Sequence, residues 1–151
     1  MRFPALLMLL AATLTACGGS SDSTGPSDTY SGTYTLRTVN GQSLPFLHDQ
    51  VETTTIEVVS DTLVIADDGN GGSFTKQMEI RVTASGVARS QSLYDAGVYT
   101  RNGTAATFRF NPPSSGCLSC SDSDGPTAVG TISGGTITFS DGAGLSYVYK
   151  K

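Results

Sequence analysis

The stretch SFTKQMEIRVT, residues 73–83, alternates between apolar and polar side chains. Its apolar face carries Phe74, Met78, Ile80 and Val82. A period of two is typical of an antiparallel strand with one buried face, because successive side chains of a strand point to opposite sides. Lys76 interrupts the pattern, since the alternation places it on the apolar face.

The same alternation recurs after residue 30 in segments separated by turn-forming residues. Asn102-Gly103 is the strongest hairpin signal, because both central positions of a type I′ turn need a positive φ angle, and Gly134-Gly135 is nearly as good. Asp95-Ala96-Gly97 marks another corner, and Ser60-Asp61 is either a tight turn or a bulge within one long strand. The other predicted strands are Gly32–Val39, Thr54–Val59, Thr62–Ala66, Val87–Tyr94, Val98–Arg101, Thr104–Phe110, Thr127–Ile132, Thr136–Ser140 and Leu145–Lys150.

The composition indicates an all-β chain. Of its 151 residues, 18 are Gly and 39 are Ser or Thr, whereas 15% are charged. Thr packs well on a pleated surface, and Gly and Ser serve turns. We therefore expect an antiparallel up-and-down meander of about eight to ten short strands, ending as a sandwich or as a closed barrel. A barrel is the simpler expectation, because closure removes the exposed edges that invite aggregation.

The first residues have the layout of an export signal. Arg2 precedes the apolar run Ala5–Leu14, which is about half as long as a helix that spans a bilayer. The following Leu14-Thr15-Ala16-Cys17 resembles the lipobox of bacterial lipoproteins. That resemblance implies cleavage of a signal peptide, residues 1–16, and a diacylglycerol on Cys17; the alternative is an ordinary secretory signal. Gly18, where Asp would favour the inner membrane, implies the outer membrane in a host that has one.

Residues 17–29 contain no large apolar side chain and are predicted to form a flexible tether to a single domain, residues 30–151. Segments of that domain resemble lipocalin-like bacterial lipoproteins: Gly32–Leu36, Asn40–Pro45 and Tyr147–Lys150, with Gly97–Thr100 and Gly130–Ile132 fitting the same pattern. The resemblance implies a lipocalin-like barrel with a long loop after the first strand. Leu44, Phe46 and Leu47 of that loop would plug or gate one end of the barrel.

Cys117 and Cys120 lie in the irregular stretch Asn111–Pro126. In an exported protein two neighbouring thiols tend to pair, so we expect a small structural disulfide. Half of a zinc site is the alternative, but zinc takes four ligands and the only histidine, His48, is far away in the sequence. The sequence therefore gives no metal site.

Lys76, with Phe74 and Met78 beside it, is the candidate ligand contact. A charged side chain inside a barrel is costly unless it is paired or lies near the mouth. Lys76 either meets an acidic group of a ligand at the entrance, or its stem covers apolar surface while its amine reaches water; its place near the strand start favours the second interpretation. Most aromatic residues, Tyr94 among them, are predicted to fill the core.

The net charge and the lack of a catalytic motif limit the classes of function that the sequence allows. A net charge of −4 disfavours nucleic acid as a partner. No nucleophile–base pair or pair of carboxylates has a plausible catalytic spacing, so we expect neither catalysis nor a cofactor. The expected function is non-catalytic: a lipid-anchored envelope protein, held at the membrane through Cys17, whose barrel binds a small apolar molecule. The alternative is an interaction module with a filled barrel that meets another envelope protein, and a cavity of roughly 300 Å³ or more would favour the first.

Overall fold

The computed structural model describes residues 30–112 and 126–151. Within these ranges the chain has strands and no helix, and every strand pair is antiparallel. The strands are β1 (Gly32–Val39), β2 (Gln42–Ser43), β3 (Phe46–Val51), β4 (Thr54–Asp67), β5 (Gly71–Ala84), β6 (Val87–Asn102), β7 (Ala105–Phe110), β8 (Thr127–Ser133), β9 (Thr136–Ser140) and β10 (Ser146–Lys150).

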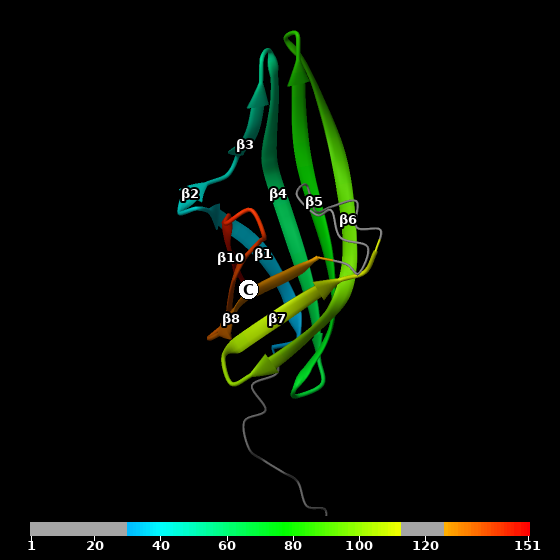
Figure 1. The fold of residues 1–151 in the computed structure, drawn as a ribbon, viewed down its shortest axis with the longest axis vertical. Coiled ribbons are helices and arrows are strands. Elements are labelled where there is room, and N and C mark those ends of the chain that lie inside the picture. The colour runs from blue at the N-terminus through cyan, green and yellow to red at the C-terminus, as the bar shows by residue number, and fades with distance from the viewer. Residues whose placement is uncertain (1–29, 113–125) are drawn as a thin grey trace, which may run out of the picture.

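Strand β1 closes the sheet into a barrel because it has a partner on each edge. It pairs with β10 through Thr35–Val39, and with β4 through Gly32–Thr35. From β4 to β10 each strand pairs with the next along the chain. The result is an eight-stranded antiparallel barrel made of β1 and β4 to β10 (Figure 1). The predicted all-β meander and its closure are confirmed.

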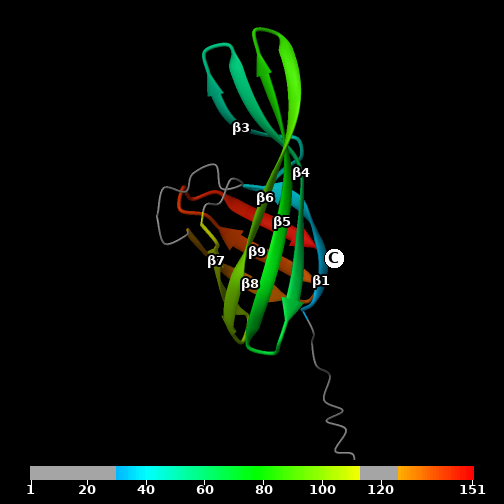
Figure 2. The same cartoon turned by 90° about the vertical axis from the view of Figure 1, so that its right-hand side faces the viewer.

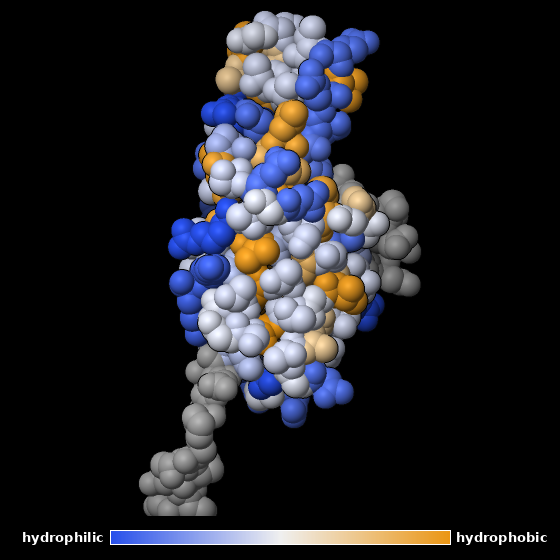
Figure 3. All heavy atoms as spheres, turned by 90° about the vertical axis from the view of Figure 1, so that its left-hand side faces the viewer, coloured by the Kyte–Doolittle hydropathy of each residue, from blue (hydrophilic) through white to orange (hydrophobic). Residues whose placement is uncertain are grey.

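Three strands are too long for this barrel and continue beyond it. β4 and β5 have 14 residues each and β6 has 16, whereas β9 and β10 have 5. The ends of β4 (54–58), β5 (80–84) and β6 (87–91) pair with one another beyond the barrel, and β3 joins them beside β4. We call this sheet the extension; it stands above the barrel in Figure 2. In the space-filling view it is a narrow projection with hydrophobic and hydrophilic residues side by side (Figure 3).

A β-bulge marks the point where the extension leaves the barrel. The register of β4 against β5 shifts between Val58 and Ser60. Below the bulge β4 pairs with β1 from residue 62, and above it β4 pairs with β3 up to Val58. Bulges bend a strand and re-aim its side chains. Of the two interpretations of Ser60-Asp61, the bulge within one long strand is therefore confirmed and the tight turn is wrong.

Aromatic rings fill the barrel and form one continuous cluster. Phe74 meets Phe108 and Phe110 edge-on, with ring centroids 5.6 and 5.0 Å apart. Phe108 also contacts Tyr99 and Phe139, at 5.5 and 5.6 Å. Offset and edge-to-face ring pairs add stability beyond the area that they bury. The buried aromatic residues of the eight barrel strands are Tyr34, Phe74, Tyr99, Phe108, Phe110, Phe139, Tyr147 and Tyr149, and Phe46 of β3 is buried as well.

Several local predictions need correction. Residues 95–97 are no corner, because β6 runs through them without a register shift. The loop predicted after the first strand contains β2 and β3; Phe46 is buried and Leu44 packs against the core, but Leu47 is exposed. The hairpin near Asn102 exists, but its two-residue loop is Gly103-Thr104, with a positive φ only at Gly103. That pattern belongs to a type II′ turn.

Gly97 explains why residues 95–97 can continue the strand. A Cβ atom at this position would lie 2.1 Å from the carbonyl oxygen of Arg109 and 2.7 Å from the ring of Phe74. Glycine within a strand often marks such a close approach of a neighbouring group. The glycine that looked like a turn signal therefore serves packing.

We predict that Gly97→Ala lowers the free energy of unfolding by about 1–3 kcal/mol, because the added methyl group overpacks a filled core. The matched control is Gly142→Ala, where a Cβ atom meets nothing within 4 Å. That control is expected to change stability by less than about 0.5 kcal/mol. Urea unfolding of both variants measures the difference, and equal stabilities would contradict the packing role of Gly97.

Candidate functional site

Three charged side chains are buried together in the barrel, below the extension. Asp61, Lys76 and Asp95 are only 0%, 5% and 7% exposed. They come from neighbouring strands: Lys76 of β5 lies directly opposite Asp95 of β6, and Asp61 lies on β4. The Lys76 Nζ atom is 2.8 Å from Asp61 Oδ2, and the hydroxyl group of Tyr149 donates a hydrogen bond of 2.7 Å to the same oxygen. We call these four residues the buried polar cluster.

Burial dominates the electrostatics of the cluster. It raises the pKa of Asp61 above its ordinary value, although the ammonium group of Lys76 and the hydroxyl group of Tyr149 act in the opposite direction. Burial and the neighbouring Asp61 raise the pKa of Tyr149 well above its ordinary value. Tyr149 therefore keeps its proton and remains a hydrogen-bond donor at neutral pH.

The position of Lys76 corrects the interpretation that its amine reaches water. The side chain points inward, as the alternation predicts, but its amine is held by Asp61 below the surface. A buried charge is tolerated when it is paired and hydrogen-bonded. One oxygen of the cluster, Asp61 Oδ1, is buried without a hydrogen-bond partner among the described residues.

The barrel interior around this cluster is filled. A cavity large enough for a ligand would leave the side chains that line it accessible to water-sized molecules. Instead, the central residues of the interior are at most 2% exposed: Tyr34, Leu36, Leu63, Ile65, Phe74, Tyr99, Phe108, Ile132, Ile137 and Tyr149. Phe74 and Met78 are core residues on the same face as Lys76, and their role in ligand binding stays a prediction.

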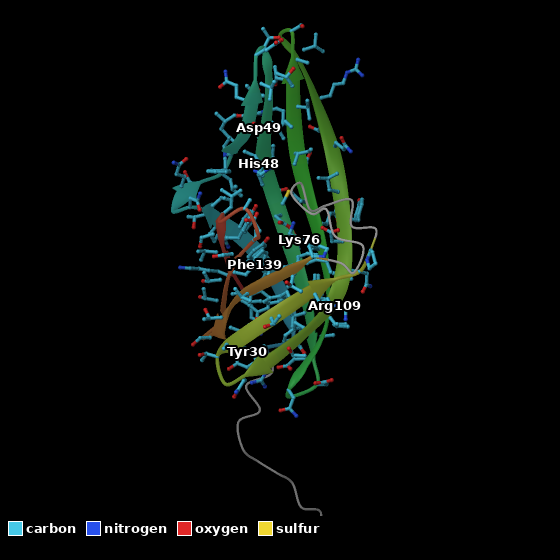
Figure 4. All side chains as sticks on the ribbon, in the orientation of Figure 1. Tyr30, His48, Asp49, Lys76, Arg109 and Phe139 are labelled. Atoms are coloured by element: carbon cyan, nitrogen blue, oxygen red, sulfur yellow. The ribbon has the colours of Figure 1, made fainter. Side chains whose placement is uncertain are left out.

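The other predicted site residues are scattered or lie outside the described ranges. Cys17, Cys117 and Cys120 fall outside residues 30–112 and 126–151. His48 and Asp49 lie on β3 in the extension, well above Lys76 (Figure 4). In the part of the chain that the structure describes, no group of three or more His, Cys, Asp and Glu side chains could hold a metal ion.

At the opposite end of the barrel, Tyr30, the first described residue, contacts Asp67 and Arg101. The backbone N–H of Tyr30 donates to Asp67 Oδ2 at 3.2 Å, and the guanidinium group of Arg101 lies 4.7 Å above the Tyr30 ring. Burial alone would raise the pKa of Asp67, but hydrogen bonds from the N–H groups of Gly69 and Tyr30 hold it below the ordinary value. This end of the barrel lies far from the extension (Figure 4).

Two hollows of similar size on the outer surface are lined by described residues. The first, of about 380 Å³, lies on the outer face of β4, β5 and β6, the face turned to the viewer in Figure 2. It is lined by Thr62, Val64, Thr75, Lys76, Gln77, Tyr94, Asp95 and Ala96. The second, of about 370 Å³, lies over β6, β7 and β8, and is lined by Thr100, Arg101, Asn102, Ala105, Ala106, Thr107, Val129 and Gly130.

The extension has two edges that differ in regularity. β3 forms one edge, and its register against β4 shifts between Leu47 and Asp49. The other edge is the first half of β6, which pairs with β5 without interruption from Val87 to Thr100. β7 pairs with β6 only from Gly97 onward, so residues 87–94 have one neighbouring strand within the described chain.

Sequence reasoning missed Asp61, Asp95, Tyr149 and the exposed Tyr94. For Asp95 and Asp61, the alternation of side chains along the strand contained the signal. Asp95 alternates with the inward residues Leu93, Gly97 and Tyr99, and Asp61 alternates with Leu63 and Ile65. The assumed corner at residues 95–97 hid the first pattern. Because Asp95 points inward, Tyr94 points outward, and its side chain is 60% exposed rather than part of the core.

Comparisons with known proteins find no matching family model, no similar curated protein and no similar solved structure. The described residues form no helix that is long and apolar enough to cross a membrane.

We predict that Lys76→Met lowers the free energy of unfolding by about 3–5 kcal/mol at neutral pH, because it leaves the Asp61 carboxylate buried without a counter-charge. A carboxyl group with a raised folded-state pKa contributes stability at low pH, and this contribution is lost as the pH rises through that pKa. The deficit of the variant should therefore shrink as the pH falls from neutral towards the ordinary carboxyl value.

Urea unfolding of wild type and variant across this pH range measures the effect. The double variant Asp61→Asn/Lys76→Met is the control, because it removes both charges and should recover part of the lost stability. A loss that does not depend on pH would argue that the pairing of Lys76 with Asp61 is not its cause.

Proposed function

We propose that the protein is a lipid-anchored, non-catalytic envelope protein that docks another envelope protein through its extension. In this proposal it is one of the lipocalin-like lipoproteins, with Cys17 as its membrane attachment and the outer membrane as its destination. The lipobox-like segment and the closed eight-stranded barrel support these two parts. The regular edge of β6 in the extension is the observation that supports docking.

The edge of β6 fits an extended segment of a partner chain. Natural sheets protect their edges with bulges, prolines or charges, and an unprotected edge is a template for another strand. Each edge carries one charged residue, Asp49 on β3 and Arg89 on β6, but β3 has a bulge whereas residues 87–94 of β6 are in regular register. The β6 edge is therefore the better acceptor, and backbone hydrogen bonds would supply the affinity.

The position of Tyr30 relative to the extension also supports docking through the extension. Tyr30, the first described residue, lies at the barrel end opposite the extension (Figure 4). An anchor on Cys17 would join the barrel at that end through the segment before Tyr30. The extension is then at the barrel end farther from the attachment point, where its edge and the exposed Val51 and Val87 are accessible to a partner.

Binding of a small apolar molecule in the barrel is the second candidate. The dense packing around Phe108 and the charges of Asp61 and Lys76 disfavour it, because an apolar ligand gains nothing from a filled, charged interior. Native mass spectrometry of the purified protein separates the candidates, since a co-purified small molecule would favour the barrel site over the extension.

For the anchor, we predict that Cys17→Ser moves the protein from the membrane fraction to the soluble fraction. Several acyl chains give stable membrane attachment, and each buried CH₂ group contributes about 0.8 kcal/mol. Fractionation of cells and mass analysis of the N-terminal peptide measure the change. Unaltered membrane partition of the variant would refute the lipid anchor without bearing on the extension.

For docking, we predict that a photo-crosslinking amino acid at Ser90, on the β6 edge, captures one defined envelope protein in intact cells. The same label at Gln50, on the irregular β3 edge of the same extension, is the matched control and should capture much less of it. The captured protein is identified by mass spectrometry, so that both positions are compared for the same partner.

Substitutions at the edge complete this test. Ser90→Lys/Ser92→Lys places charges along the β6 edge and should abolish capture of that partner, since edge lysines oppose strand addition. Both residues are exposed, so the free energy of unfolding should change by less than about 0.5 kcal/mol. Equal capture from both edges, or capture that the lysines do not reduce, would count against docking at β6.

A further inference from the structure

The hollow on the outer face of β4, β5 and β6 is built from two adjacent rows of side chains. In the first row Thr62, Gln77 and Tyr94 lie directly opposite one another on the three strands. In the second row Val64, Thr75 and Ala96 do the same. Strands are about 4.8 Å apart, so each row presents closely spaced side chains on the outer face of the barrel.

The accessible side chains of this hollow are uncharged: they include hydroxyl and amide groups, the apolar Val64, which is 42% exposed, and one aromatic ring. Thr62 and Thr75 offer hydroxyl groups, Gln77 offers an amide, and Tyr94 is 60% exposed. Lys76 and Asp95 also border the hollow, but their side chains are buried and the Lys76 amine contacts Asp61. Strand β1 extends the first row with another hydroxyl group, because Thr35 lies opposite Thr62.

This set of groups matches the chemistry of a sugar ring. The C–H groups on one face of a pyranose form an apolar surface that packs against an aromatic ring, while its hydroxyl groups need donors and acceptors such as amides and hydroxyls. Sites for small molecules combine apolar contact with a few oriented polar groups in the same way, in volumes of about 300–1,000 Å³. The hollow of about 380 Å³ lies within this range.

The surroundings favour a neutral sugar over an acidic one. The next outward residue of β5 beyond Gln77 is Glu79, whose carboxylate would repel an acidic group. The chain as a whole carries a net charge of −4. The hollow over β6, β7 and β8 has a similar volume, but it has no aromatic side chain and is bordered by Arg101. It therefore serves as an internal comparison.

We propose that the outer face of β4, β5 and β6 binds a neutral polysaccharide chain, with Tyr94 packed against one sugar ring and Gln77, Thr62 and Thr75 bound to its hydroxyl groups. This site is separate from the barrel interior and from the backbone edge of residues 87–94. It adds a carbohydrate ligand to a protein proposed to dock another protein, and it does not depend on that docking.

Cellotetraose and chitotetraose are suitable probes, since both are neutral and extended. Titration of the ¹⁵N-labelled protein with either at millimolar concentration should shift the amide signals of Thr62, Thr75, Gln77 and Tyr94, and leave those of Thr100 and Thr107 unchanged. Tyr94→Ala should weaken the binding about tenfold through loss of the ring contact. Tyr94→Phe, which keeps the ring, should retain most of it.

Two controls accompany the titration. Thr107→Ala, in the comparison hollow, should leave binding unchanged. Urea unfolding should show that Tyr94→Ala stays folded, with a free energy of unfolding within about 1 kcal/mol of wild type, because the ring is mostly outside the core. Absence of shifts with both sugars overturns the proposal, and so do shifts that Tyr94→Ala does not weaken. If the sugars fail but Tyr94→Ala removes a crosslinked envelope protein, this face is a protein contact instead.

Discussion

The pairing of β1 with both β10 and β4 is the constraint on which the rest of the structure depends. It leaves no free edge around the barrel, but it uses only residues 62–65 of the long strand β4. The remaining part of β4, beyond the bulge at Val58–Ser60, needs another partner and finds it in β3. The extension is thus a consequence of closure with strands of unequal length, since β5 and β6 follow β4 out of the barrel.

Closure of the barrel also determines the surroundings of the charged side chains that point inward. Once the sheet is closed and filled by aromatic rings, Asp61, Lys76 and Asp95 have little access to water, and their exposed fractions are all below a tenth. A lone buried charge would be expensive, so the ion pair of Lys76 with Asp61 and the hydrogen bond from Tyr149 are conditions of the fold. The contacts among these residues therefore offset the cost of burying them, and the binding surfaces that we propose lie outside the barrel.

The sequence predicts the repetitive part of this fold and misses what depends on its three-dimensional context. The alternation of residues 73–83 and the turn at Gly134-Gly135 follow from local chemistry, and the strand and the hairpin are both present. The corner at residues 95–97 is wrong, because a glycine used for packing under Phe74 has the same local signature as a glycine in a turn. The partner of Lys76 and the exposure of Tyr94 depend on register across strands, which no single segment contains.

The β6 edge and the hollow belong to the same strands, yet they can be occupied together. A strand added at residues 87–94 would form hydrogen bonds in the plane of the sheet, whereas Tyr94, Gln77 and Thr62 project from the face of that sheet. The two surfaces also draw on different chemistry, since one offers backbone groups and the other offers side chains. Occupation of one therefore leaves the groups of the other in place, so a protein partner and a polysaccharide need not compete for this domain.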